Sequence, residues 1–417
     1  MKYDIQYIRN QFPATKRTVN GFPVAYFDGA AGTQVPQRVV DKMSDYLLNH
    51  NANKHGHYAT SLESDELLNG ARQTIADFLG CSMEEVSFGA SSTANTFFIS
   101  QAIVRDLNPG DEIVITDLDH ECNRSPWITL EERGMIVKSV KINKEKYILD
   151  MEDFASKITP TTKVVAIGYA SNATGTINDV NTVIEMAHAV GALTVVDSVH
   201  YAAHKPIDVK AIDTDFLICS AYKFFGPHIG ILYTKNDIAN NLRTLKPIPN
   251  DDIPPVKFET GTDNFESICG AAEAVEFIAD IGVMSEDNVI TGLEGLEERR
   301  RNIVAGMLAL DKYENELLRY LNTELRKIPE LTFYSVPEGY SKTPTISFSI
   351  EGKNSADICK YLAQKGVFAA NGHFLATELI INILRLEEIG GPVRVSFAPY
   401  NTMEEVERLI EAVKESL

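Results

Sequence analysis

Residues 214–233, TDFLICSAYKFFGPHIGILY, place a lysine directly after an apolar run with the length of a buried strand. Lysine is rarely buried without a partner, so Lys223, between Tyr222 and Phe224, has two interpretations. Its ammonium group reaches solvent along the apolar stem, or a desolvated setting removes its charge. In the second case the amine becomes a nucleophile for aldehydes, which is the chemistry of lysines that form Schiff bases.

A second apolar run, ALTVVD at 192–197, ends in a carboxylate, and we expect it to share a sheet edge with Lys223. A buried aspartate needs a paired cation. The protonated pyridine nitrogen of pyridoxal 5′-phosphate (PLP) would supply that cation, because enzymes that use PLP hold this nitrogen with Asp or Arg. The alternative is that Asp197 caps a turn with Ser198.

The region from about residue 25 to residue 233 alternates helical patterns with short β-branched runs, which predicts an α/β fold with a mostly parallel, doubly wound sheet. The expected strands cover residues 86–88, 112–116, 136–140, 163–168, 192–197, 216–220 and 230–233, and helices are expected at 63–79, 92–107 and 180–190. Ligands of such sheets bind outside the carboxyl ends of the strands. The residues that follow each strand are therefore the candidates for a site.

After Met284 the pattern changes to a charged helix, expected over 289–327, and then to an α+β arrangement. Its expected strands are 331–334, 345–350 and 393–397, and its helices are 355–366 and 403–417. A chain of 417 residues exceeds the usual single core. We therefore predict a segment at 1–20 that packs with the small domain, a large PLP-binding domain at 21–284 and a small C-terminal domain at 285–417.

The composition narrows the range of partners. A formal net charge of −19 argues against nucleic acid, since that binding depends on Lys and Arg neutralising phosphates. No apolar stretch approaches the roughly 20 residues of a membrane helix, and the first residues lack a signal-peptide pattern. The five cysteines are scattered without CxxC spacing, and His55 and His57 have no ligand-spaced acidic or Cys cluster beside them. We expect a cytoplasmic protein with reduced thiols, no metal, and a small-molecule ligand.

Two further segments suit a flat, phosphorylated cofactor. The turn Gly89–Thr93 offers backbone N–H groups, hydroxyls and a helix N-terminus, which together suit a phosphate, although such a run is also a common helix cap. Phosphate-binding GxxxxGK[ST] and GxGxxG motifs are missing from the sequence, which weakens ATPase and dinucleotide interpretations. His120 follows the strand 112–116, where its imidazole could stack on a cofactor or serve a structural role.

In their order along the chain, these motifs resemble the class V aminotransferase family, and specifically its cysteine desulfurase-like branch of fold-type I PLP enzymes. The resemblance spans nearly the whole chain. It is carried by residues 27–32 (FDGAAG), 91–93 (SST), 119–120 (DH), 171–176 (SNATGT), 196–200 (VDSVH), 220–223 (SAYK), 261–262 (GT) and 393–396 (VRVS).

The resemblance implies a role for each matched residue. Lys223 would hold PLP as a Schiff base and then move protons, His120 would stack on the ring, and Asp197 would keep its nitrogen protonated. Asn172 and His200 would flank the phenolic oxygen, and Arg394, with Ala30 and Asn172, would bind the substrate amino acid. The implied phosphate ligands are Ser92, Thr93, Ser220 and Tyr222, with Thr262 reaching the phosphate from the second subunit of a homodimer.

Departures from the family pattern leave the reaction open. His200 stands where relatives commonly have Gln, and SAYK replaces SGHK. In the stretch 370–375, Ala370 and Leu375 occupy the places of an arginine and of a persulfide-forming cysteine. We therefore expect a PLP-dependent lyase of the cysteine desulfurase or selenocysteine lyase type without a loop persulfide. The alternatives are a class V aminotransferase, an epimerase resembling isopenicillin N epimerase, or a catalytically silent binding protein.

Overall fold

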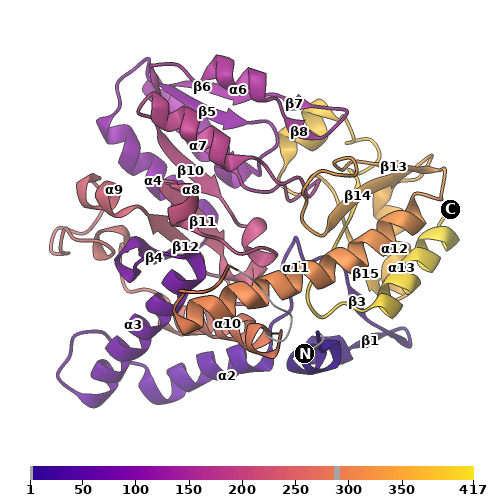
Figure 1. Cartoon of the computed structure of the whole chain (residues 1–417), viewed down its shortest axis with the longest axis horizontal. Coiled ribbons are helices and arrows are strands. Elements are labelled where there is room, and N and C mark those ends of the chain that lie inside the picture. Colours follow the sequence, from indigo (N-terminus) through magenta and orange to yellow (C-terminus); the bar gives the residue numbers. More distant parts are fainter. Residues whose placement is uncertain (1–2, 286–291) are drawn as a thin grey trace.

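Seven strands form the central sheet of the computed structural model, which describes residues 3–285 and 292–417 (Figure 1). Strand β12 is antiparallel to both of its neighbours, β4 and β11, and the other pairs are parallel. In spatial order the strands are β4 (Val86–Gly89), β12 (Gly230–Thr234), β11 (Phe216–Ser220), β10 (Leu193–Asp197), β9 (Thr162–Gly168), β5 (Glu112–Thr116) and β6 (Ile136–Val140). Each lies within one residue of its predicted bounds, so the predicted sheet is confirmed.

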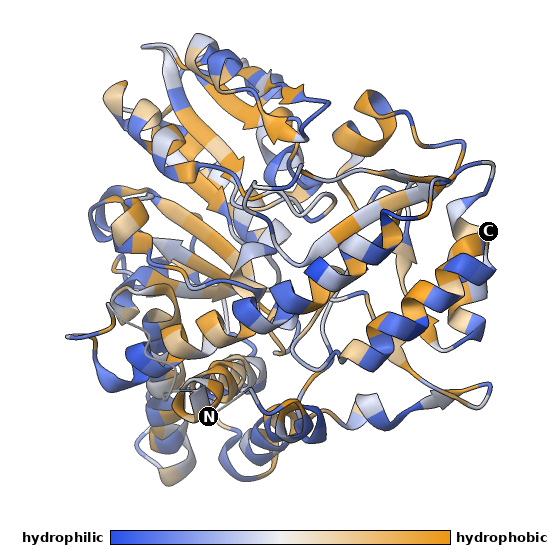
Figure 2. Cartoon of the chain, turned by 45° about the vertical axis from the view of Figure 1, so that its right-hand side comes forward, coloured by the Kyte–Doolittle hydropathy of each residue, from blue (hydrophilic) through white to orange (hydrophobic). Residues whose placement is uncertain are grey.

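Alternate residues of the central strands point to opposite sides of the sheet. Because both sets are apolar, both faces of the sheet are covered by helices. Leu217 and Cys219 of β11 belong to one hydrophobic cluster, whereas Phe216 and Ile218 belong to the other. The first cluster includes residues of helices α3 (Ala59–Leu79), α7 (Val180–Ala189) and α10 (Phe265–Ser285), and the second includes residues of α4 (Ser92–Ile103) and α9 (Asn236–Asn241). Figure 2 shows the strands mainly in the hydrophobic colour. This arrangement leaves the strand ends to carry polar chemistry.

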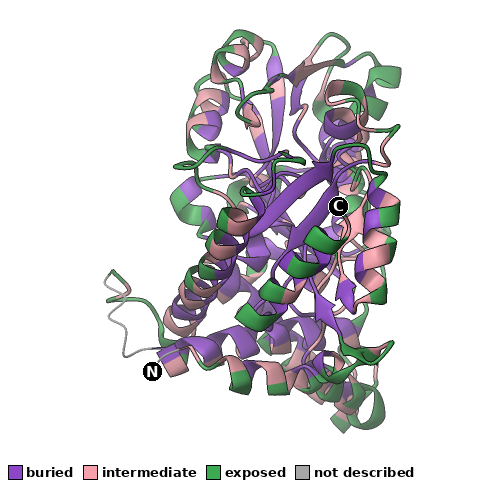
Figure 3. Cartoon of the chain, turned by 90° about the vertical axis from the view of Figure 1, so that its right-hand side faces the viewer, coloured by how far each residue is buried: buried purple, intermediate pink, exposed green. Residues whose placement is uncertain are grey.

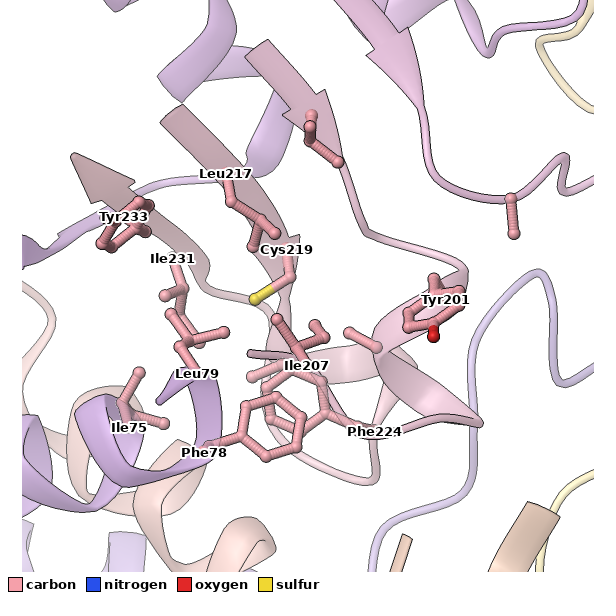
Figure 4. Close-up of a cluster of buried hydrophobic side chains, with 14 of the residues drawn as sticks. Ile75, Phe78, Leu79, Tyr201, Ile207, Leu217, Cys219, Phe224, Ile231 and Tyr233 are labelled. Carbon is pink, nitrogen blue, oxygen red and sulfur yellow. The ribbon is translucent and has the colours of Figure 1, made fainter. Parts of the chain in front are cut away.

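The residue that follows Lys223 anchors its turn in the first cluster. Figure 4 shows Phe224 beside Phe78, at the end of α3, close to Cys219 and Ile231 of the neighbouring strands. The centroids of the Phe78 and Phe224 rings lie 4.8 Å apart, and both side chains are buried. The backbone that carries Lys223 is therefore anchored to the hydrophobic core through the next residue, Phe224.

A four-stranded antiparallel sheet forms the second part of the molecule, and Figure 3 shows its strands buried. Its strands, in spatial order, are β13 (Leu331–Phe333), β14 (Thr345–Ile350), β17 (Val393–Ser396) and β16 (Ala370–Asn371), and α11 (Glu298–Leu325), α12 (Ser355–Gln364) and α13 (Met403–Glu415) accompany it. The predicted start of the charged helix is wrong: α11 begins at Glu298. Gly292 and Gly295 both have φ of +92°, which is incompatible with a helix, and residues 289–291 lie outside the described residues.

The N-terminal segment bridges the two sheets. Helix α1 (Ile5–Gln11) pairs Arg9 with Glu405 of α13, at 2.7 Å, and the next residue, Phe12, packs edge-on against Tyr400, Phe225 and Phe277. Strand β3 (Ala25–Tyr26) pairs with β15 (Val367–Phe368). The division into domains at residues 20 and 284 stays a prediction. Over residues 3–285 and 292–417, no helix has the length and apolarity needed to span a membrane.

Candidate active site

The carboxyl ends of several central strands surround a cavity of about 160 Å³. It contains nine of the predicted site residues and seven others that were not assigned to the site. The predicted ones are Ala30, Ser92, Thr93, His120, Asn172, Asp197, His200, Tyr222 and Lys223, and the others are Ser91, Asp119, Cys122, Gly168, Ala170, Val199 and Leu375. Residues brought from five strand ends and from the loop at 375 thus share one space.

Lys223 lies in a single turn of 3₁₀ helix, Ala221–Lys223, directly after β11, and is 8% exposed. Its Nζ donates hydrogen bonds to the carbonyl oxygens of Ala30 and Ala31, at 2.6 and 2.8 Å. Burial, aided by the nearby Arg394 guanidinium, lowers the pKa of Lys223 to about 7, and Asp197 opposes the shift. A substantial fraction of the amine is therefore unprotonated near neutral pH, as a nucleophile requires.

Asp197, at the end of β10, is held by two donors. Its Oδ1 accepts a hydrogen bond from the Val199 N–H at 2.9 Å, and its Oδ2 accepts one from the Cys122 thiol at 3.1 Å. Burial and the carboxylate itself raise the pKa of Cys122, so the thiol keeps its proton and acts as the donor. The sequence did not reveal this contact, because 75 positions separate the two residues.

The orientation of His120 is fixed by the backbone of Cys122, two residues further along the chain. Its Nδ1 accepts a hydrogen bond from the Cys122 backbone N–H at 3.0 Å, which leaves the ring proton on Nε2. Burial lowers the pKa of His120. A neutral, oriented imidazole therefore lines the cavity beside Asp197.

Asp119 braces the site from behind. Its carboxylate accepts hydrogen bonds from Thr116, Asn123 and the Gly168 N–H at 2.7 to 2.9 Å, and burial raises its pKa to about 7. A Cβ at position 168 would lie 2.8 Å from the Asp119 Oδ1, so only glycine permits this approach. Asp119 thereby ties the end of β5 to the end of β9.

The N-terminus of α4 offers a surface that suits a phosphate group. Ser91 caps this helix by accepting a hydrogen bond from the Ala94 N–H at 3.1 Å, while Ser92 and Thr93 line the cavity. Gly230 of β12 allows the turn to come close, since a Cβ there would lie 2.4 Å from the Ser91 carbonyl carbon. The hydroxyl of Ser220 is buried with no protein partner in the described part of the chain. Hydroxyls and a helix N-terminus together suit an anion.

The small sheet closes the site. Arg394 on β17 donates to the Asn172 carbonyl at 3.0 Å and lies over the Phe374 ring, 4.0 Å from its centroid. Asn172 Nδ2 donates to the Phe374 carbonyl at 2.8 Å, and the Glu121 N–H donates to the Leu375 carbonyl at 2.7 Å. Within the described residues, Arg394 Nε and Asn172 Oδ1 are buried without a hydrogen-bond partner. The Arg394 Nε–H is thus a donor that could bind a substrate carboxylate, and Asn172 Oδ1 is an acceptor for an N–H or O–H of a bound group.

Two predicted residues need separate description. His200 lines the cavity, but its Nε2 faces the hydroxyls of Thr343 and Thr345, at 2.9 and 3.1 Å. Thr262 lies in a different groove of the chain, together with Gly89, Ala90 and His228. The structure thus brings nine of the predicted site residues together in the lining of one cavity and leaves Ser220, Thr262 and Arg394 outside that lining.

Comparisons with known proteins identify the family. A model of the family "Aminotransferase class-V" matches residues 25–294 and 289–409, so the chain belongs to this family of PLP-dependent enzymes. A "Cysteine desulfurase" from Enterobacter sp. strain 638 is 30% identical, with 99% of this chain and 98% of the relative covered. A "Probable cysteine desulfurase" from Mycolicibacterium paratuberculosis is 32% identical over 99% of this chain, but the chain spans only 58% of that relative's length.

Solved structures agree on the fold. The apo structure of a cysteine desulfurase from Thermococcus onnurineus NA1 has a TM-score of 0.85 and 26% identity, with 100% of this chain and 98% of that chain covered. The cysteine desulfurase CsdA from Escherichia coli has a TM-score of 0.82 over 100% of this chain and 99% of its own, at 24% identity. The predicted fold-type I architecture is therefore confirmed.

The residues present fit PLP. An amine with a pKa near 7 lies in one cavity with a buried aspartate, a neutral imidazole and a helix N-terminus. The partnerless oxygen atoms of Ser220 and Asn172 are acceptors or donors that a bound group would satisfy. Among the residues that the structure describes, no group of three or more His, Cys, Asp or Glu is arranged to hold a metal.

Proposed function

We propose that this chain is a PLP-dependent lyase that acts on cysteine or a related β-substituted amino acid, with the cofactor attached to Lys223. The observation that carries the proposal is the buried amine of Lys223 in one cavity with Asp197. The names of the relatives support the choice of substrate class. When bound, PLP withdraws electrons from the Cα atom of an amino acid, which makes the loss of a Cα proton easier.

Residues of the large sheet would bind and tune the cofactor. Asp197 would pair with the ring nitrogen, and its two donors, Cys122 and the Val199 N–H, keep the carboxylate oriented. His120 would stack on the ring. Phosphate oxygens would be bound by Ser92 and Thr93 at the N-terminus of α4 and by Ser220 and Tyr222 at the end of β11.

Lys223 would accept and return the proton at Cα, because its lowered pKa leaves a free base near neutral pH. Arg394 would bind the substrate carboxylate through its partnerless Nε edge, with Asn172 and Ala30 beside it. Burial lowers the pKa of Arg394, but guanidinium remains the residue of choice for a bidentate carboxylate contact. The substrate would therefore lie between the large sheet and β17.

The sulfur atom would leave the active site without first being bound covalently to a residue of the small-domain loop. Leu375 lines the cavity from this loop, and none of the five cysteines lies there. Cys359 belongs to α12, and burial raises the pKa of both Cys359 and Cys122, so neither offers a reactive thiolate. Elimination would release the sulfur as sulfide, with pyruvate and ammonia as the other products. Alternatively, an external thiolate would attack the sulfur atom of the bound cysteine, and the electron pair of the broken C–S bond would stay on carbon, which is released as alanine. Leu375 also favours the second candidate, a class V aminotransferase or epimerase, because such reactions need no thiol acceptor.

Two measurements test this proposal. Borohydride reduction of the purified protein, followed by peptide mapping, should place PLP on Lys223. Incubation with single amino acids, with and without keto acids, should then yield sulfide from cysteine as the principal new product. A label on another lysine overturns the cofactor site, whereas keto-acid-dependent transamination or D-amino acids without sulfide would favour the second candidate.

The same proposal includes a homodimer. Thr262 lies in a groove beside the α4 turn rather than in the cavity of its own chain, which is the placement expected of a residue that acts on a second copy. Sedimentation should give a dimer. In mixtures of Thr262→Ala and Lys223→Ala chains, half of the sites in a mixed dimer would carry both defects and half neither, so activity should be partly restored. A fully active monomer contradicts this arrangement. The cytoplasmic location also stays a prediction.

A further inference from the structure

His200 is held from outside its own loop. The loop follows β10 of the large sheet, whereas Thr343 and Thr345 belong to the segment that enters β14 of the small sheet. His200 is 4% exposed, and both threonines are fully buried. The contacts at 2.9 and 3.1 Å both meet the same ring atom, Nε2. One imidazole nitrogen is thus shared by two hydroxyl groups.

The hydroxyl groups decide which nitrogen carries the proton. Within the described residues, the Thr345 hydroxyl has His200 Nε2 as its only partner, so its hydrogen has no other acceptor. The Thr343 hydroxyl has one alternative, the Gly175 carbonyl at a longer 3.3 Å. If Nε2 carried the proton, the buried Thr345 hydroxyl would be left with an unused donor, which is destabilising. Nε2 is therefore an acceptor, and the proton lies on Nδ1.

We infer that Nδ1 is on the cavity side of the His200 ring, opposite the two threonine hydroxyls. It has no protein partner in the described part of the chain, and unlike His204 Nε2 it is not among the buried atoms that lack a partner. His200 itself lines the cavity. The accessible space next to Nδ1 therefore belongs to the cavity in which we place the cofactor.

The surroundings keep the ring neutral. Burial lowers the pKa of His200 well below its usual value, and the titratable groups that face it, His204 from its own loop, Arg394 and Lys223, act in the same direction. His204 packs edge-on against His200, with centroids 5.2 Å apart, and its own Nδ1 lies 2.9 Å from the buried Glu314 of α11. The ring is therefore fixed in position as well as in charge.

We propose that Thr343 and Thr345 are positioning residues that fix His200 in the tautomer protonated on Nδ1, so that His200 donates a hydrogen bond into the cofactor cavity. The oxygen that receives it would be the phenolic oxygen of PLP, which is anionic near neutral pH; this part rests on the proposed function. A neighbouring strand of the small sheet thus sets the electronic state of a group bound by the large sheet. In this arrangement the histidine supplies one N–H from a neutral ring.

The test reads the tautomer and the cofactor separately. In full-length protein with ¹⁵N-labelled histidine, the His200 signals, identified by their loss in His200→Gln, should show a protonated Nδ1 and a bare Nε2. In the Thr343→Val, Thr345→Val double variant the proton should redistribute to Nε2. The pH midpoint of the cofactor's absorbance change should rise by about one unit, the equivalent of losing one hydrogen bond to a charged group.

Two variants serve as controls. Thr345→Ser keeps the hydroxyl and should match the unmodified protein in both measurements. Thr332→Val makes the same exchange at an exposed position of β13 and should change neither. The single Thr345→Val variant should show a smaller shift of the same sign and remains usable if the double variant does not fold.

The outcomes are separable. A bare Nδ1 in the unmodified protein, or a tautomer and midpoint that do not respond to Thr345→Val, would overturn the inference even if Lys223 carries PLP. Failure to label Lys223 would instead overturn the proposed function, while the nitrogen signals would still report on the threonines.

Discussion

The carboxyl edge of the large sheet and the inward face of β14 and β17 contribute to the site in different ways: the first lines the cavity, and the second contacts the loops that line it. At the large sheet each strand delivers its polar residue once, after the apolar run has ended, as Asp197 does. On β14 the polar residues recur at every second position, and Thr345 and Ser347 are completely buried. Ser347 donates to the Ala173 carbonyl at 2.5 Å and is paired with Arg394 of β17. Alternation usually indicates a strand with one face in water; here the polar face is turned toward the loops of the other sheet.

If the large-sheet edge provides the reacting group, Lys223→Ala should give the largest loss, about 10²- to 10⁴-fold in kcat, since it removes a general acid and base. Single-turnover kinetics with cysteine measure this. Lys235→Ala, which removes a surface lysine at the other end of β12, is the matched control and should leave kcat unchanged. Near-normal turnover without Lys223 would move the chemistry to another group.

The β17 side of the comparison depends on Arg394. Arg394→Gln should lower kcat/KM about 30-fold or more, mostly through KM, because it removes a buried charge that would pair with the substrate carboxylate. Steady-state kinetics with the amino acid and with its methyl ester measure this effect. Because the ester has no carboxylate, the unmodified protein and Arg394→Gln should have similar kcat/KM values for it. The exposed Arg326→Gln serves as the control in the same part of the molecule. A loss in kcat alone would assign Arg394 a role other than carboxylate binding.

The lowered pKa of Lys223 predicts that the rate of PLP binding depends on pH, and we expect this effect to be smaller than those of the two substitutions above. Since the pKa lies at about 7, the amine is protonated below that pH and neutral above it. After the cofactor is removed, the rate of PLP uptake should rise about tenfold per pH unit up to pH 7 and then level off. Stopped-flow absorbance between pH 5.5 and 10 measures this. A rate that keeps rising toward pH 10 would indicate an ordinary solvated lysine.

The smallest effect is expected at the contact between Cys122 and Asp197. Cys122→Ala should reduce turnover by no more than about threefold, because a thiol is a weak donor and the Val199 N–H still holds the carboxylate. Mass spectrometry under non-reducing conditions after cysteine turnover should find no persulfide on Cys122. A stable persulfide there, together with lost activity in the alanine variant, would place sulfur chemistry at the large sheet.

The sequence predicted the large-sheet edge well because each signal is local. The apolar run and the polar residue that follows it are neighbours in the chain, so Lys223, Asp197 and His120 could be found from their flanking residues. The bracing contacts could not: Thr343 and Thr345 meet His200 across 143 and 145 positions, and no local pattern specifies such a partner. The start of α11 was misjudged for another reason, since its helical composition continues through Gly292 and Gly295, whose backbone has left the helix.

The loop that carries Leu375 has a consequence for how new activities could arise on this fold. Phe374 and Leu375 both have φ of +54°, and their carbonyl groups accept hydrogen bonds from Asn172 and Glu121. The loop is thus fastened by its main chain, whereas the side chain at 375 is half exposed and borders the cavity. Evolution, or a protein engineer, can exchange that side chain for a thiol, a hydroxyl or an imidazole while the fastening stays the same. A position of this kind lets one scaffold sample several chemistries by single substitutions.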